Sequence, residues 1–110
     1  MLVNALGANG YARRELDDAA VLRADRVSTD DCDQARSEAR ELIDLSNDDE
    51  LDWDKVLELG DLVQGKHSGR GGDNEITLFK SLGVALEDIA LAKVIYDRAI
   101  AAGHGAQLGE

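Results

Sequence analysis

The sequence holds 110 residues, of which 44% are hydrophobic, 23 are acidic and 12 are basic, so the formal net charge is −11. This length is typical of one small domain with a modest core. The apolar residues come in short runs, which argues against both a disordered composition and a membrane span of about 20 apolar residues. The negative charge opposes binding to nucleic acid or anionic lipid, so we expect neither as a partner.

Aspartate outnumbers glutamate by 15 to 8, and arginine outnumbers lysine by 8 to 4. This balance is typical of acidic proteins of halophilic organisms, in which concentrated salt screens the repulsion between charges. The first residues, MLVNALGANG, carry no basic region and no extended apolar segment, which argues against a secretory signal and favours a cytoplasmic location. The single cysteine, Cys32, cannot form an internal disulfide.

The first predicted element is a short buried strand over residues 2–6, followed by a tight loop over residues 7–10. Ligands often lie against loops that follow strands. Asp17 or Asp18 is expected to cap a short helix that runs to Leu22.

Residues 26–29 are compatible with a second strand, and the acidic cluster that follows predicts the start of a longer helix. This cluster consists of Asp30, Asp31 and Asp33. The helix is predicted to bury a single apolar stripe. The stripe consists of Ala35, Ala39, Leu42 and Ile43.

The middle of the chain is polar and rich in glycine. Residues 46–54 predict an acidic surface loop that Trp53 anchors, and residues 56–63 predict a short helix. Residues 65–72 contain four glycines and no apolar residue, which indicates an irregular loop. Residues 75–79 then predict a strand.

The last predicted element is a long helix over residues 84–102, whose apolar side chains lie almost all the way round it. A helix that is apolar on most sides has to be covered on most sides, and a domain of this size covers only one. We therefore expect this helix to pack against another domain or subunit. The alternation of strands and helices predicts an α/β domain with a mainly parallel sheet.

Three local patterns resemble known sites but lack required residues. Residues 60–66 match the start of a phosphate-binding loop, but His67 stands where the magnesium-binding hydroxyl belongs. Neither His67 nor His104 has a second ligand at zinc spacing, and the acidic residues 48–52 lack the glycine and distal glutamate of a calcium loop. We expect no metal site. The glycine fingerprint of dinucleotide-binding domains is also absent.

Four segments follow one another in a characteristic order. They are residues 4–9 (NALGAN) with 14–17 (RELD), residues 24–27 (ADRV), residues 58–61 (ELGD) with Gly65-Lys66 and Gly69-Arg70, and residues 75–83 (EITLFKSLG) with Ala85, Glu87-Asp88 and Ala92. Their order and spacing resemble the later part of the ornithine cyclodeaminase and mu-crystallin family over nearly the whole chain.

The resemblance implies a two-domain homodimeric enzyme, with a Rossmann-type domain for NAD or NADP and a second domain for a small amino or imino acid. Residues 1–80 would form the C-terminal half of the Rossmann-type domain, with a partial parallel sheet. Residues 81–110 would form the helix that returns to the substrate and dimerisation domain. The substrate-binding cations, the first βαβ unit and the glycine fingerprint are expected upstream, so we expect this chain alone to be an inactive C-terminal fragment.

The resemblance also implies which residues contact ligands, although it assigns no catalytic residue to this chain. The expected cofactor contacts are Leu6, Gly7, Ala8, Asn9, Arg13 and Ser81. Asn9 and Leu82 would line the substrate side. A glycine-containing loop allows backbone to approach the nicotinamide, and Ser81 and Leu82 would offer N–H groups to a polar or anionic ligand. The alternatives are a turn role for Gly7 and a surface charge for Arg13.

The implied chemistry is hydride transfer at the α-carbon, as in an amino-acid dehydrogenase such as alanine dehydrogenase or in a ketimine reductase. Asn9 stands where true ornithine cyclodeaminases carry an aspartate. An amide cannot accept a proton near neutral pH, which favours the dehydrogenase or reductase. The alternatives are an ornithine cyclodeaminase that makes proline and ammonia, and a non-catalytic truncated or ligand-binding protein.

Overall fold

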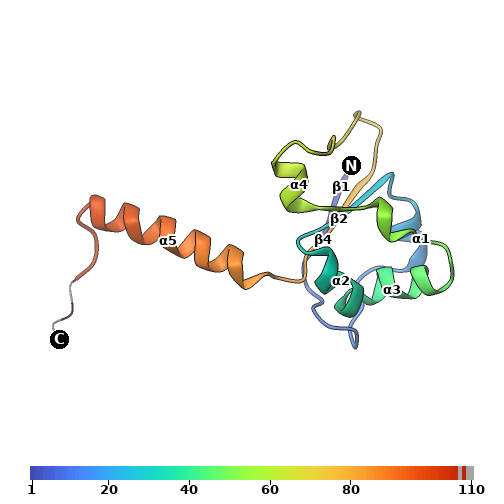
Figure 1. The fold of residues 1–110 in the computed structure, drawn as a ribbon, viewed down its shortest axis with the longest axis horizontal. Coiled ribbons are helices and arrows are strands. Elements are labelled where there is room, and N and C mark those ends of the chain that lie inside the picture. The colour runs from blue at the N-terminus through green and yellow to red at the C-terminus, as the bar shows by residue number, and fades with distance from the viewer. Residues whose placement is uncertain (107, 109–110) are drawn as a thin grey trace.

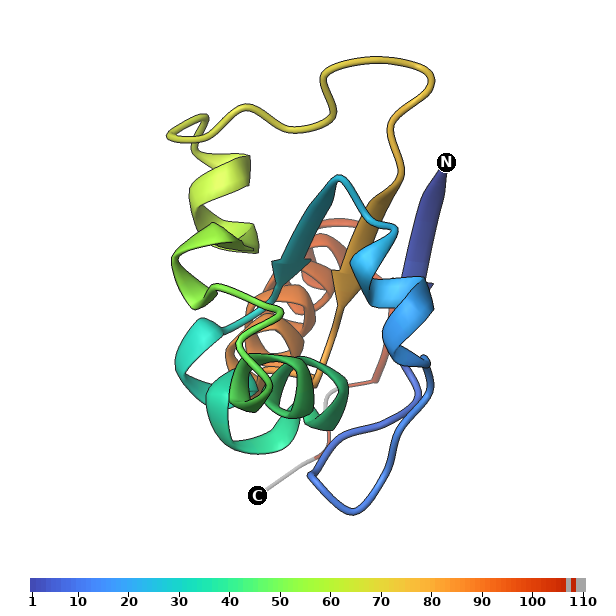
Figure 2. The ribbon, with the colours of Figure 1, turned by 90° about the vertical axis from the view of Figure 1, so that its right-hand side faces the viewer.

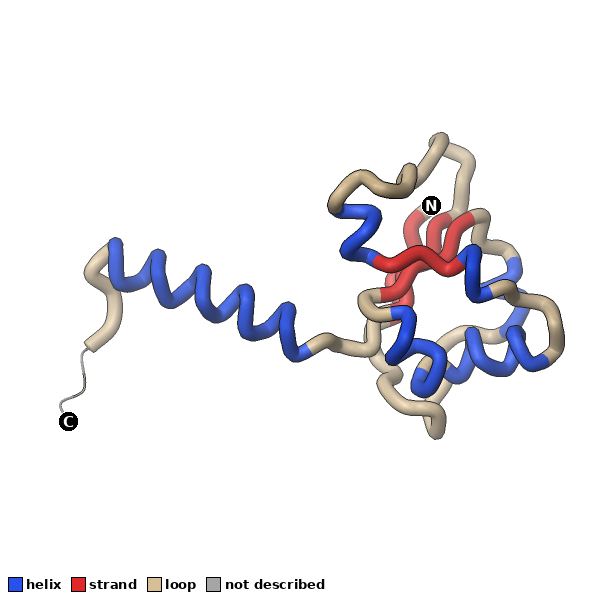
Figure 3. The backbone as a smooth tube through the Cα atoms, viewed as in Figure 1, coloured by secondary structure: helices blue, strands red, loops and turns tan. Residues whose placement is uncertain are grey.

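The computed structural model describes residues 1–106 and 108. Within them, helices and strands follow one another along the chain as β1 (Leu2–Ala5), α1 (Asp18–Leu22), β2 (Arg26–Thr29), α2 (Cys32–Glu38), α3 (Arg40–Asn47), the 3₁₀ turn η1 (Trp53–Lys55), β3 (Val56–Glu58), α4 (Leu59–Val63), β4 (Thr77–Lys80) and α5 (Ala85–Ala101). The described strands form one parallel sheet in the order β1-β4-β2-β3. This confirms the predicted α/β class with a partial parallel sheet. Figures 1 and 3 show the strands and the shorter helices gathered together, with α5 standing apart from them.

The register of the sheet aligns the ends of three strands. Ala5 of β1 and Thr29 of β2 both pair with Lys80 of β4, which lies between them. Because the strands are parallel, the loops that follow them all leave from the same edge of the sheet.

One face of the sheet packs against α1, α2 and α3 to form the core. The buried cluster consists of Ala5, Val21, Ala35, Ala39, Leu42, Leu45, Leu78 and Leu82. Burial of each leucine side chain contributes about 1.5–3 kcal/mol relative to exposure. The sequence therefore places enough apolar surface on this face to hold the three helices.

The other face of the sheet is only partly covered. Leu57, Leu62 and Phe79 border an apolar hollow of about 310 Å³ beneath α4. Leu2, on the edge strand β1, is exposed beside it. This face is more open to solvent than the face that carries the buried core.

The predicted single helix after Asp31 is wrong, because the structure has two helices there. The Asp31 side chain caps α2 by accepting a hydrogen bond from the Gln34 N–H. Ala39 then leaves the helical conformation, with ψ of 82°, and α3 begins at the next residue. Ala39, at the break, and Leu42, in α3, are both fully buried, so the predicted apolar stripe faces the core although it is divided between two helices.

The predicted helix over residues 56–63 is also wrong in its first half. Val56 and Leu57 pair with Val27 and Ser28 of β2, and the helix α4 starts only after this strand. Long-range pairing with a neighbouring strand decides the structure of a short apolar segment that is locally ambiguous. The predicted loop over residues 46–54 begins later, because α3 continues to Asn47.

Helix α5 projects away from the body of the domain (Figure 1). Its apolar side chains are exposed on several sides, with Leu86 at 72% and Tyr96 at 64%. The uncovered apolar helix predicted from the sequence is therefore present. No helix in the described part of the chain has the length and apolar character to cross a membrane. Residues 107 and 109–110, at the end of the predicted 81–110 segment, lie outside the described residues.

Candidate functional site

The predicted site residues gather at the carboxyl edge of the sheet. Figure 2 shows the long loop after β1 extending beyond the ends of the strands. The Ser81 N–H donates a hydrogen bond to the Ala5 carbonyl at 3.0 Å, which joins the segment after β4 to the end of β1. In open α/β sheets, ligands bind in the crevice outside the carboxyl ends of the strands.

Residues 6–9 form the first loop of this edge, and two of their peptide groups are held by charged side chains. The Gly7 N–H donates to Glu15 Oε1 at 2.7 Å, and the Ala8 carbonyl accepts from Lys80 Nζ at 2.7 Å. Leu6 and Asn9 are exposed, whereas Ala8 is buried. The loop therefore presents its first and last side chains to solvent.

Lys80 is fully buried and lies among carboxylates. Its Nζ donates to Glu15 Oε2 at 2.9 Å and lies 3.4 Å from Glu41 Oε1. The hydrogen bond from Lys80 holds the pKa of Glu15 below its ordinary value. The Glu41 side chain is 1% exposed and has no hydrogen-bond partner within the described residues, so the nearby Lys80 ammonium is what offsets its burial.

Asp30, at the end of β2, holds the segment that follows β4. Its carboxylate accepts hydrogen bonds from Ser81 Oγ at 2.8 Å and from the N–H groups of Leu82 and Gly83 at 2.9 Å each. Burial tends to raise the pKa of Asp30, but the Gly83 N–H and the other donors outweigh it and leave the pKa below its ordinary value. A carboxylate that accepts several N–H bonds is stabilised in its charged form.

The structure changes what the segment after β4 can offer to a ligand. We expected free N–H groups on Ser81 and Leu82, but both are donated within the protein, to Ala5 and Asp30. The Leu82 side chain lies in the core and is only 4% exposed. The Ser81 hydroxyl donates a hydrogen bond to Asp30, so its oxygen remains able to accept one.

Arg13 lies further along the loop that contains residues 6–9. Its N–H closes a turn by donating to the Gly10 carbonyl at 3.1 Å, and its side chain is exposed. The arrangement leaves the Arg13 guanidinium accessible to an anion.

Glu15, Asp30 and Lys80 are absent from the predicted site, although they fix its loops. Asp30 was expected to help start a helix, a role that Asp31 performs. The sequence did contain a signal that Lys80 is buried, because this lysine directly follows residues 76–79, which are largely apolar and predict a strand. A charged residue in that position needs a buried partner.

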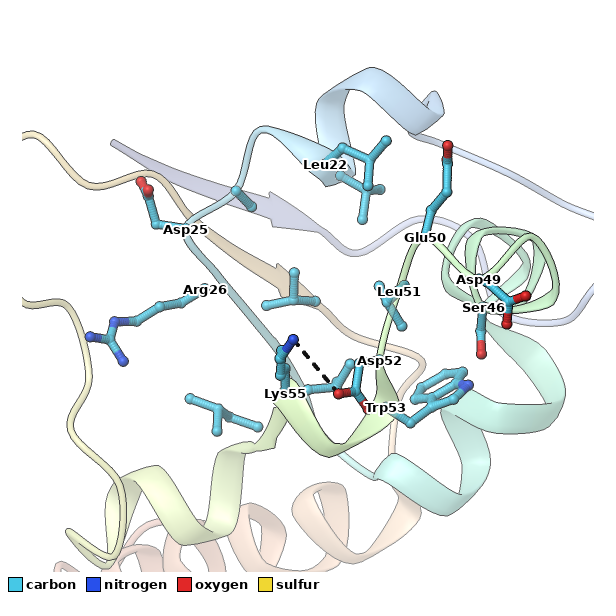
Figure 4. Close-up of a pocket in the computed structure, with 15 residues that line it drawn as sticks. Leu22, Asp25, Arg26, Ser46, Asp49, Glu50, Leu51, Asp52, Trp53 and Lys55 are labelled. Carbon is cyan, nitrogen blue, oxygen red and sulfur yellow. Dashed lines mark ion pairs between the residues drawn. The ribbon is translucent and has the colours of Figure 1, made fainter.

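A groove of about 830 Å³ lies elsewhere, against the first residues of β2 and β3 (Figure 4). Trp53 and Leu51 contribute apolar surface, and Lys55 pairs with Asp52 at 3.7 Å on its rim. It contains none of the predicted site residues. In the described part of the chain, no group of three or more histidine, cysteine, aspartate or glutamate residues is arranged to hold a metal ion.

Comparison with known proteins identifies one family. The model of the ornithine cyclodeaminase/mu-crystallin family matches residues 1–103. Alanine dehydrogenase of Archaeoglobus fulgidus is 33% identical over 96% of this chain, which corresponds to 33% of that relative.

Solved structures share the fold, among them the following two. The Delta(1)-pyrroline-2-carboxylate reductase of Thermococcus litoralis, in complex with NADH and L-proline, superposes with a TM-score of 0.85 and 32% identity, covering 98% of this chain and 33% of that one. A probable ornithine cyclodeaminase from Bordetella pertussis gives a TM-score of 0.78 and 41% identity, covering 96% of this chain and 34% of that one. The chain thus spans about a third of the length of the proteins it matches.

Proposed function

Because this chain belongs to the ornithine cyclodeaminase/mu-crystallin family, we propose that it forms the nicotinamide-binding end of an NAD- or NADP-dependent oxidoreductase that acts on small amino or imino acids. One observation carries this function. Residues 6–9 and Ser81 leave adjacent parallel strands at one edge and are both held there by buried charges. The NADH-bound reductase of Thermococcus litoralis, which superposes on 98% of this chain, supports the same assignment.

The residues at this edge fit the nicotinamide half of the cofactor. Leu6 offers an exposed apolar side chain to the ring, and the exposed Asn9 amide offers both a donor and an acceptor to the carboxamide. The Ser81 oxygen is free to accept from the carboxamide nitrogen. When bound, the cofactor would supply or accept a hydride, while these side chains orient it. The exposed Arg13 would meet an anionic part of the cofactor.

On the substrate side, the chain offers polar groups without a base. Asn9 cannot accept a proton near neutral pH. The nearby carboxylates of Glu15 and Asp30 are engaged by Lys80 and by backbone N–H groups, and the pKa of each is lowered, which makes them poor proton acceptors. Leu82 would contribute to the substrate side only through its backbone carbonyl, since its side chain is buried and its N–H is donated to Asp30.

These features favour an amino-acid dehydrogenase or ketimine reductase, in which an imine is reduced without attack by an internal amine. Ornithine cyclodeaminase is the alternative, supported by the 41% identity to the probable cyclodeaminase of Bordetella pertussis. A non-catalytic ligand-binding protein would use the same loops.

The partner of this chain would cover α5. Leu86, Ile95 and Ile100 are exposed along a helix that projects from the sheet (Figure 1). We assign residues 1–80 to the cofactor domain and residues 81–110 to the substrate and dimerisation domain, so that α5 packs against the remainder of the enzyme or a second subunit.

Titration of the ¹⁵N-labelled chain with NADH in molar KCl, followed by NMR, tests the cofactor site. ADP-ribose is the matched control, because it lacks only the nicotinamide ring. We expect NADH, but not ADP-ribose, to shift the amide resonances of Leu6, Gly7, Asn9 and Ser81. Shifts that are equal for both ligands, or that cluster around Trp53 instead, would contradict the proposed site.

A further inference from the structure

Lys80 is buried without any role in recognising the proposed ligands. It is 0% exposed, at the end of a central strand, although lysine is almost never fully buried unless it is paired. Its ammonium lies between the core helices and residues 6–9, the loop proposed to meet the nicotinamide.

The Lys80–Glu15 ion pair holds both sides of one short backbone segment. Lys80 Nζ donates to the Ala8 carbonyl at 2.7 Å and to Glu15 Oε2 at 2.9 Å. The other oxygen of Glu15 accepts from the Gly7 N–H at 2.7 Å. Strand β1 ends at Ala5, and residues 6–9 belong to no helix or strand. These hydrogen bonds therefore fix the direction of their peptide groups.

Gly7 leaves room for the Glu15 carboxylate in this arrangement. A Cβ at position 7 would lie 2.5 Å from Glu15 Oε1, the atom that accepts the Gly7 N–H. A side chain there would push Glu15 away from the loop. The glycine therefore serves the ion pair directly, whatever space the cofactor needs.

Glu41 connects the same ion pair to the core. It lies on α3, is 1% exposed, and approaches Lys80 Nζ to 3.4 Å. Lys80 thus faces two carboxylates, one in the core and one at the loop. This contact fixes the ammonium at the point from which it reaches Ala8.

We propose that Lys80 and Glu15 are positioning residues that hold residues 6–9 in the conformation that receives the nicotinamide; this inference rests on the proposed function. A loop that is ordered before binding loses less conformational entropy when the ligand arrives. Loss of the ion pair therefore weakens binding of the nicotinamide half, while binding of the rest of the cofactor is unchanged.

Two variants and one control separate positioning from stability. Lys80→Met alone leaves Glu41 buried without a cation, so its loss of stability is uninformative about the loop. Lys80→Met with Glu41→Gln removes both buried charges, and Glu15→Gln keeps an acceptor for the Gly7 N–H but loses the ion pair. The control is Lys66→Met, which removes the exposed Lys66–Asp61 ion pair.

Amide hydrogen exchange at Gly7 reports the loop without any ligand, and NADH titration with the ADP-ribose control reports its effect on binding. We expect the double variant and Glu15→Gln to melt cooperatively, to exchange the Gly7 amide about tenfold faster, and to bind NADH about tenfold more weakly, which is the factor expected for one or two lost hydrogen bonds. Lys66→Met should match the wild type.

Wild-type exchange at Gly7 and wild-type NADH affinity in both variants would overturn the positioning role. If the double variant unfolds, Glu15→Gln decides, because the Glu15 side chain is 29% exposed and its replacement leaves the core intact. Absence of any NADH-dependent shift in the wild-type chain would overturn the proposed function itself. The ligand-free exchange measurement distinguishes that outcome from failure of the ion pair to hold the loop.

Discussion

Replacing Asp30 by asparagine tests how the segment after β4 is held. Asp30 is 9% exposed and accepts hydrogen bonds from Ser81 Oγ, the Leu82 N–H and the Gly83 N–H. All three reach the same oxygen, Oδ2, while Oδ1 accepts from the Thr29 hydroxyl and the Asp31 N–H at 3.2 Å each. Asparagine replaces one of the two oxygens with an NH₂ donor, so the donors that face that oxygen lose their acceptor. Since a hydrogen bond to a charged group contributes about 1.5–3 kcal/mol, we expect Asp30→Asn to lower the free energy of unfolding by roughly 2–3 kcal/mol at neutral pH.

The effect should depend on pH in a defined direction. The pKa of Asp30 is lowered in the folded chain, so the unfolded chain binds its proton more readily. The stabilisation is then fully present above the unfolded pKa of about 4 and is lost as the pH falls through the folded pKa. The difference in unfolding free energy between wild type and Asp30→Asn should therefore be constant near neutrality and shrink in acid.

Urea denaturation followed by circular dichroism, in molar KCl, measures both quantities. Asp73→Asn is the matched control, since Asp73 is exposed and its replacement removes the same charge. The reasoning is refuted if Asp30→Asn is as stable as the control at neutral pH. It is refuted equally if the difference stays the same down to the lowest pH at which the chain still unfolds cooperatively.

Four further outcomes follow from the structure and the proposed function. Leu42→Ala should lower the free energy of unfolding by about 3 kcal/mol because it opens a cavity in the core, whereas Val63→Ala at an exposed position should have little effect in the same urea titration. The chain alone should show no protein-dependent loss of NADH absorbance with pyruvate and ammonia; clear turnover would contradict its proposed need for a partner. In dilute buffer the chain should self-associate or unfold, because its exposed apolar helix accompanies a charge of −11; a monodisperse, cooperatively melting monomer in sedimentation and melting experiments would refute this. Joined to the amino-terminal two thirds of the Archaeoglobus fulgidus alanine dehydrogenase, the chain should support reduction of pyruvate with ammonia or of a cyclic ketimine; efficient conversion of ornithine to proline with Asn9 in place would refute the assignment.

Elements with a complete local signal could be predicted from the sequence. Asp17 caps α1 through the Ala20 N–H, as expected, and α5 spans almost the predicted residues. Elements that depend on partners distant in the sequence could not be predicted in this way. β3 exists because it pairs with β2, and the break at Ala39 carries no local signal such as a glycine or a proline.

The residues of the proposed site divide in the same way. The resemblance predicted that the loop after β1 and the segment after β4 contact ligands, because each is contiguous in the sequence, and the structure places both at one edge of the sheet. The side chains that hold these two segments could not be predicted from the sequence. Lys80 and Glu15 are 65 residues apart, and Leu82 and Asp30 are 52 residues apart. The sequence could not show that the N–H groups of Ser81 and Leu82 are occupied, because their acceptors are distant in the sequence: the Ala5 carbonyl at the end of β1 and the Asp30 carboxylate after β2.

The charges at the carboxyl edge also limit what ligand this edge can recognise. Lys80 is directed at a carbonyl and at carboxylates, and Asp30 is directed at N–H groups, so neither presents its charge to a ligand. Apart from Arg13, the groups that remain at the proposed site are uncharged, namely the Leu6 side chain, the Asn9 amide and the Ser81 oxygen. Uncharged donors and acceptors suit a nicotinamide carboxamide better than a phosphate, which needs cations or free N–H groups. In a chain with a net charge of −11, the pyrophosphate of a dinucleotide would have to be held chiefly by residues outside this edge, with the exposed Arg13 as the contribution from this loop.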